Sequence, residues 1–190
     1  MPHTSDLETA LREHLGATFA GHTITAHDLD DVGRLRASVP GFRVLEVHPG
    51  PKASTWAYVT CGAAGIAHPN SPTMEFLTTS GERSKRVAHL LTMVASYHAT
   101  EGLGLQHTFG LGEPWVDGCN LTAGYVSLPY PWGPALELFE HDGQVTHIYW
   151  LMPISAAERE LARRAGTDAL EERFEDADVA YWDLRRRSVV

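Results

Sequence analysis

The chain has 190 residues, of which 43% are hydrophobic, and a formal net charge of −9. This length and composition are typical of a globular domain with one sizeable core, and they exclude a disordered or fibrous chain. The negative charge argues against nucleic acid and anionic membrane surfaces as partners, because both attract clustered lysine and arginine side chains.

The first predicted helix covers about residues 6–19. Its apolar side chains recur at helical spacing, at Leu7, Ala10, Leu11 and Leu15. Ser5 and Glu8 have the spacing of a capping box, in which a side-chain oxygen and a carboxylate satisfy free N–H groups at a helix start. The sequence therefore predicts that this helix begins close to Ser5.

Three strands are predicted next, at residues 42–47, 55–61 and 73–78, where apolar residues alternate and β-branched and aromatic types are frequent. The glycine- and proline-rich residues between the second and third strands are expected to form a loop. The longest helix is then predicted between Gly81 and Gly102. Its apolar residues recur at intervals of three and four: Val87, Leu90, Leu91, Val94 and Ala95.

The second half of the chain begins with a region punctuated by glycine and proline, residues 103–134, which is expected to hold short strands and long loops. A hairpin is predicted after it, with strands at residues 135–140 and 145–152. Asp142 and Gly143 lie between them and form the Asp-Gly pair that favours a tight turn. The nearly continuous apolar run of the second strand predicts burial on both faces.

The junction after this hairpin is predicted to end a strand and start a helix. Pro153 has no N–H to donate to a sheet and is expected to end the strand. Ser155 and Glu158 have capping-box spacing, Gly166 is expected to end the helix, and Thr167 to cap a second short one. Together, the elements predict an α+β fold: one domain with a mixed or mostly antiparallel sheet and helices packed against it.

The eleven histidines prompt a search for a metal or catalytic site. No His-Glu-x-x-His motif occurs and no histidine pair has i,i+4 spacing in a predicted helix, so no metal is expected. The phosphate-loop, dinucleotide and Gly-x-Ser-x-Gly motifs are also absent from the sequence, so no cofactor is expected. Two functional hypotheses stay open beside that of a protein-binding module, which is developed below. One is a small hydrolase using histidine with a carboxylate or with Cys61. The other is a structural homo-oligomer joined through an exposed strand edge.

The location of the protein is predicted from its cysteines and its apolar runs. Cys61 and Cys119 lie far apart and form no Cys-x-x-Cys pair, so two reduced thiols are expected. No run approaches the roughly 18 apolar residues of a membrane-spanning helix. The N-terminus has no basic region followed by an apolar stretch, so no secretory signal is expected. The sequence thus predicts a cytoplasmic protein.

Aromatic residues in the predicted loops are the candidate partner-binding residues. Trp115, Tyr130 and Trp132 are of this kind, and Asp117 lies near the first of them in the sequence. Tryptophan and tyrosine are enriched among the residues that dominate protein interfaces. The alternative is that these rings anchor their loops to the core, which is a common role in a domain of this size.

Three parts of the sequence resemble the Suppressor of fused family. Residues 56–62 resemble the family's Trp-x-Tyr-x-Ser-x-Gly strand, with Thr60 where the family often has serine. Residues 74–77, together with the long helix that follows, form the second part. The third part is residues 150–158 with the closing Asp-x-x-Arg-x-Ser of residues 183–188.

The resemblance covers about residues 40–188 and implies that residues 1–190 form one Suppressor of fused-like domain, with residues 1–20 as an added N-terminal helix. Animal members of this family carry a second domain and bind transcription factors of the Hedgehog pathway. Short bacterial members, which this chain resembles, include immunity proteins that neutralise a cognate toxin. The resemblance therefore implies a non-enzymatic module without a cofactor, whose partner is another protein such as a toxin.

Overall fold

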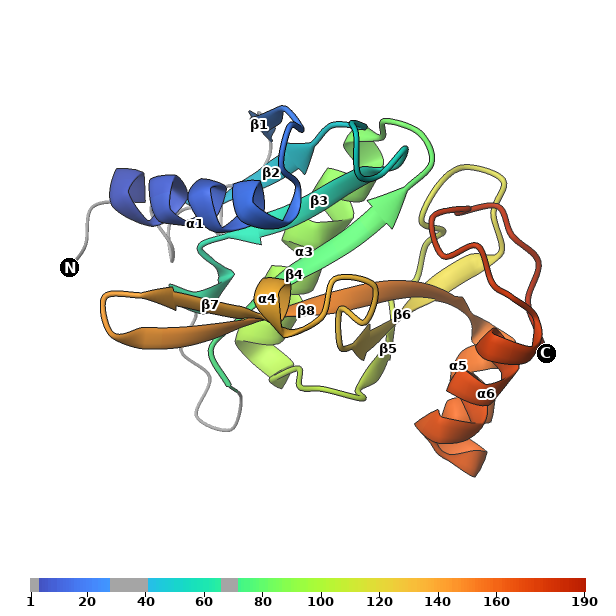
Figure 1. Ribbon diagram of the computed structural model, residues 1–190. Helices are drawn as coiled ribbons and strands as arrows, with labels where there is room; N and C mark the ends of the chain where they lie inside the picture. Colours follow the sequence, from blue (N-terminus) through green and yellow to red (C-terminus); the bar gives the residue numbers. More distant parts are fainter. Residues whose placement is uncertain (1–3, 28–40, 66–71) are drawn as a thin grey trace.

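The computed structural model describes residues 4–27, 41–65 and 72–190, and these form one eight-stranded sheet (Figure 1). The strands are β1 (Ile24–His27), β2 (Arg43–Val47), β3 (Trp56–Cys61), β4 (Met74–Ser80), β5 (Thr108–Gly110), β6 (Leu121–Ser127), β7 (Leu138–His141) and β8 (Gln144–Ser155). Their order is β1-β2-β3-β4-β8-β6-β5, with β7 also paired to β8. Only the β4–β8 pair is parallel among these strands, so the sheet is mixed and mostly antiparallel. The predicted α+β fold is confirmed.

Helices cover both faces of this sheet. They are α1 (Thr4–Thr18), α3 (Lys85–Glu101), α4 (Pro134–Glu137), α5 (Ala156–Ala165) and α6 (Thr167–Asp176), with a 3₁₀ turn η1 at Ala63–Gly65. Figure 1 shows α3 behind the sheet, α1 in front of it, and α5 and α6 stacked at the end of β8. In the described ranges, no helix is long and apolar enough to cross a membrane.

The central strands are buried on both faces because successive side chains enter different cores. In β4, Phe76 packs with the residues of α3, whereas Leu77 packs with those of α1 and α6. All seven residues of β4 are buried. A strand covered on both faces reads as a nearly continuous apolar run instead of a strict alternation, as the sequence of β8 also does.

The long helix α3 has the two ends that its flanking residues favour. The Ser84 hydroxyl accepts a hydrogen bond from the Val87 N–H at 3.3 Å, which caps the first turn. Gly102 ends the helix in the left-handed conformation, with φ of 69°, which glycine adopts without steric cost. The prediction of a helix between Gly81 and Gly102 is confirmed.

The predicted strand at 135–140 is wrong in its first half. Residues Pro134–Glu137 form the short helix α4, and strand β7 begins only at Leu138. Proline fits the first position of a helix, and alanine, leucine and glutamate favour helix over strand. The predicted turn is confirmed, because Asp142 and Gly143 both have positive φ, 50° and 72°.

The prediction that Pro153 ends its strand is also wrong, since β8 continues to Ser155. The register of β4 on β8 stops at Trp150, so beyond that residue β8 pairs with β6 alone. The Pro153 carbonyl accepts a hydrogen bond from Arg186 Nη2 at 3.0 Å, which indicates that it points to the side where β4 has ended and not toward β6. Since the N–H and C=O of a strand residue point the same way, the N–H that proline lacks would face no strand.

The helices after β8 agree with the sequence at most positions. Ser155 and Glu158 form both hydrogen bonds of the predicted capping box, and Gly166 follows the last residue of α5. The predicted cap at Thr167 is wrong, because Gly166 is the cap residue of α6 and Thr167 already lies inside the helix. The capping box predicted at Ser5 lies outside the side chains that the structure describes.

A buried carboxylate holds the turn that follows β3. Glu75 accepts hydrogen bonds from the Thr60 hydroxyl at 2.5 Å and from the N–H groups of Gly62, Ala63 and Ala64 at 2.8–3.1 Å. Burial raises the pKa of Glu75 to about 7, although these hydrogen bonds act to lower it. Glu75 therefore ties β4 to η1 with a group that titrates close to neutral pH.

Candidate functional site

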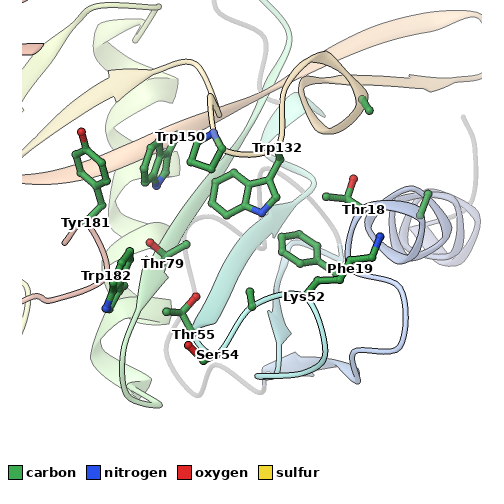
Figure 2. A pocket seen from close by; sticks show the side chains of 14 residues that line it. Thr18, Phe19, Lys52, Ser54, Thr55, Thr79, Trp132, Trp150, Tyr181 and Trp182 are labelled. Atoms are coloured by element: carbon green, nitrogen blue, oxygen red, sulfur yellow. The ribbon is translucent and has the colours of Figure 1, made fainter. Parts of the chain in front are cut away.

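A groove of about 730 Å³ lies on the sheet face that α1 partly covers (Figure 2). Its walls are the C-terminal end of α1, the loop before β3, the connection from β6 to α4 with Ala135 of that helix, and residues 181–182. Its floor includes Thr79 of β4 and Trp150 of β8. We call it the aromatic groove, after the five rings that line it: Phe19, Trp132, Trp150, Tyr181 and Trp182.

Four of these rings hold one another in place. Trp132 packs edge-on against Trp150 with centroids 5.5 Å apart, and also contacts Phe19 at 5.9 Å. Tyr181 packs edge-on against Trp150 from the other side, at 4.9 Å. Edge-to-face packing of this kind fixes ring orientation, so this wall of the groove is preorganised for contact.

Trp182 is the ring of the groove that has the most solvent contact, with 49% of its surface exposed. Its backbone is fixed, because its carbonyl accepts a hydrogen bond from the Gly81 N–H at 2.8 Å. The next apolar residue, Leu184, is buried in the core on the α3 side. A large apolar side chain is thus held at the surface by an ordered backbone.

Trp150, in contrast to Trp182, is buried, with only 4% of its surface exposed. Its indole N–H has no hydrogen-bond acceptor among the residues that the structure describes. Figure 2 shows this nitrogen at the end of the ring nearest Thr79. An unsatisfied buried donor costs about 1–3 kcal/mol, so this position favours a ligand that supplies an acceptor.

A second pocket of about 440 Å³ continues the aromatic groove and shares Pro131, Trp150 and Tyr181 with it. It adds Tyr130 and two carboxylates of α6, Glu171 and Glu175. We call it the acidic pocket. Lysine and arginine are absent from the described residues that line it.

The sequence profile described as Suppressor of fused protein (SUFU) matches residues 38–187. The chain belongs to this family. A SUFU homologue from Neisseria gonorrhoeae FA 1090 has the same fold, with 28% identity, a TM-score of 0.83 and 98% of both chains covered.

More distant solved structures share the fold alone. A chain of the Sufu–Fu complex is 14% identical, with a TM-score of 0.68 over 97% of this chain and 92% of that one. Drosophila Suppressor of Fused is 12% identical with a TM-score of 0.64, and this chain spans 51% of it.

Immunity protein YqcF of Bacillus subtilis strain 168 is similar over a shorter stretch. The two are 36% identical over 64 residues, which is 33% of this chain and 32% of that protein. The match therefore spans about a third of the curated relative, and what that relative does is carried over only as a proposal.

The structure places the four predicted partner-binding residues of this family member on two sides of the sheet. Trp115 is fully buried in the core on the α3 side, and its indole N–H donates to the Ala123 carbonyl at 2.8 Å. Asp117 is almost fully exposed, 3.8 Å from the Arg86 guanidinium. Tyr130 and Trp132 lie instead in the acidic pocket and the aromatic groove. Trp115 thus has the loop-anchoring role that was the alternative.

Sequence reasoning missed most of the aromatic groove. Phe19 and Trp150 lie within predicted apolar patterns, where buried residues are the ordinary expectation. The adjacent rings Tyr181 and Trp182 did carry a signal, because they stand together in a polar segment after the last helix. Two large aromatics at such a position favour an exposed or partly exposed role.

The histidine, carboxylate and cysteine side chains that a hydrolase would use are engaged in structural contacts or held in an unreactive form. His27 Nδ1 lies 2.8 Å from Glu46, whose other oxygen accepts from Arg83 at 2.9 Å. Burial raises the pKa of the Cys61 thiol, with a further contribution from the charge of Glu75. A thiol that stays protonated is a weak nucleophile. Within the described residues, no group of three or more His, Cys, Asp or Glu side chains could hold a metal ion.

Proposed function

We propose that this SUFU-family protein is a non-enzymatic module, residues 1–190, that binds another protein through the aromatic groove. The observation that carries the proposal is the pairing of two features in one groove. One is the half-exposed ring of Trp182, and the other is the indole N–H of Trp150, which has no acceptor in the described part of the chain. An exposed ring gains from burial, and an orphan donor gains from an acceptor.

A protein partner fits this groove better than a small cofactor does. The groove is lined by residues from six different segments of the chain, and tryptophan and tyrosine are the residues that dominate protein interfaces. Trp132 and Tyr130 are proposed to contact the partner. Asp117, on the other side of the sheet, is proposed as a peripheral contact. The family includes a protein solved as the Sufu–Fu complex.

The finer form of the proposal is an immunity protein that neutralises a toxin in the bacterial cytoplasm. It is supported by the local similarity to immunity protein YqcF and by the net charge of −9, which would speed association with a basic toxin. Cys61 and Cys119 are both free thiols, as a reducing compartment requires.

Co-expression tests both parts of this proposal. The protein is produced together with a candidate toxin taken from its neighbouring genes, and growth is compared for the native chain, Trp182→Ala and Tyr97→Ala. Tyr97 is a matched control, because it is a half-exposed aromatic on α3, on the other side of the sheet. We expect protection by the native chain and by Tyr97→Ala, and loss of protection with Trp182→Ala.

Two other results would contradict the proposal separately. Growth arrest regardless of the native protein would reject toxin neutralisation. Full protection by Trp182→Ala would reject the aromatic groove as the binding surface while leaving neutralisation in place.

A further inference from the structure

Helix α6 carries a strong excess of negative charge toward one end of the aromatic groove. It has a single basic residue, Arg173, and five acidic ones: Asp168, Glu171, Glu172, Glu175 and Asp176. Glu171 and Glu175 line the acidic pocket. The nearby Arg186 pairs with a different carboxylate: its guanidinium binds Glu158 at 2.6 and 3.0 Å and the Pro153 carbonyl, and it lies 5.2 Å from the Phe174 ring centroid. Among the residues that the structure describes, no lysine or arginine lines the pocket to neutralise Glu171 and Glu175.

The aromatic rings of the acidic pocket add a second attraction for a cation. Tyr130 is 63% exposed, and Tyr181 and Trp150 form the wall shared with the aromatic groove. Partial burial and the charges of Glu171, Asp168 and Glu137 raise the pKa of Tyr130, in agreement with a negative potential around its ring. A cation near an aromatic face and a carboxylate is stabilised by both.

The indole N–H of Trp150 favours a peptide over a free cation as the ligand of the acidic pocket. Its buried indole N–H has no acceptor among the described residues, and its ring lines both the acidic pocket and the aromatic groove. A metal ion or a simple amine would leave this donor unsatisfied. A peptide segment supplies a backbone carbonyl for the N–H as well as a basic side chain for the carboxylates.

We propose that the acidic pocket binds a lysine or arginine side chain of the protein partner, on a segment that runs along the aromatic groove and offers a backbone carbonyl to Trp150. This inference rests on the proposed function and specifies the chemistry of the partner. The apolar rings of the groove would contact the residues that flank the basic one, and Glu171 and Glu175 would pair with its charge.

Blocked pentapeptides of alanine with a central arginine, glutamine or glutamate test this proposal by NMR titration at low salt. The tryptophan indole resonances are followed, and the Trp150 signal is assigned with Trp150→Phe. We expect the arginine peptide to shift the Trp150 indole and to bind roughly threefold more tightly than the glutamine peptide, the gain of one exposed cation–aromatic contact. The glutamate peptide is expected to bind most weakly.

Two variants of α6 provide the matched control. Glu175→Gln removes a carboxylate of the acidic pocket, and Glu172→Gln removes the same charge from an exposed residue of the same helix that does not line it. Glu175→Gln is expected to weaken the arginine peptide roughly two- to fivefold, and Glu172→Gln to leave its affinity nearly unchanged.

Equal binding of the arginine and glutamine peptides would overturn the inference while leaving the aromatic groove as a peptide-binding surface. Equal effects of the two variants, or the absence of any shift at Trp150 with the arginine peptide, would also overturn it. The co-expression experiment decides the proposed function independently of these results.

Discussion

Glu158 and Arg186 form a buried ion pair that joins the start of α5 to the C-terminal segment. Arg186 Nη1 lies 2.6 Å from Glu158 Oε1, and neither side chain is more than 8% exposed. Glu158 also accepts from the N–H groups of Ser155 and Val189. The segment that this pair secures includes Tyr181 and Trp182, so the ion pair supports one wall of the aromatic groove.

Replacing Arg186 with methionine is expected to lower the free energy of unfolding by about 3 kcal/mol. The change leaves the Glu158 carboxylate buried without its charged partner, which is the costly way to break a buried pair. Arg185→Met is the control, because Arg185 pairs with Glu82 at an exposed position, where breaking an ion pair changes stability little. Urea denaturation measures both, and similar losses would contradict the structural role of Arg186.

The same pair predicts a loss of stability in acid. Burial alone would raise the pKa of Glu158, but the hydrogen bonds and charge of Arg186, with the N–H groups of Ser155 and Val189, hold it below its usual value. A carboxylate with a lowered pKa in the folded state stabilises above the unfolded pKa of 4.5 and loses that contribution as pH falls through the lower folded pKa. Unfolding measured from about pH 3 to pH 6 should show this loss in the native chain and a smaller one in Arg186→Met.

Glu75 predicts the opposite dependence near neutral pH. Burial raises its pKa to about 7 in the folded protein, so the folded state holds a proton that the unfolded state releases near pH 4.5. Its contribution to stability therefore falls as pH rises between these values, with a slope of at most about 1.4 kcal/mol per pH unit. Chemical denaturation between about pH 4.5 and pH 7 should show a weaker pH dependence of the free energy of unfolding in Glu75→Gln than in the native chain. The same pH dependence in both would show that Glu75 is already ionised in the folded protein.

Ser155→Ala is expected to cost about 1 kcal/mol of stability, the usual value of a lost helix cap. The Ser155 hydroxyl accepts from the Glu158 N–H at 3.1 Å and lies 2.8 Å from the Ser188 hydroxyl. Ser188→Ala removes only the second contact and should cost less. Thermal or chemical denaturation of the two variants measures the difference, and equal losses would show that the cap contributes little.

Trp115→Phe and Trp150→Phe form a matched pair, since each removes the same atoms from a buried indole. The Trp115 N–H donates to the Ala123 carbonyl, whereas the Trp150 N–H has no acceptor in the described part of the chain. Trp115→Phe is therefore expected to cost about 1 kcal/mol more than Trp150→Phe. A larger loss for Trp150→Phe in chemical denaturation would indicate that its N–H is already satisfied in the free protein.

The features predicted correctly are those that neighbouring residues decide. The capping box of Ser155 and Glu158 and the turn at Asp142 and Gly143 involve contacts within three residues, so their spacing contains the whole interaction. The resemblance to the Suppressor of fused family was likewise carried by short segments. It predicted a membership that the match over residues 38–187 confirms.

The sequence alone was enough for the longer helices α1, α3, α5 and α6, most strands, the α+β class and the family, because periodicity and caps are local properties of the chain. The tertiary structure alone decided the aromatic groove, whose rings come from residues as distant as Phe19, Trp132 and Trp182. It also decided that β8 runs through Pro153, since only the register of β4 shows which side of the strand lacks a partner. Whether an aromatic ring is buried or exposed depends on the residues, distant in the sequence, that the sheet places next to it.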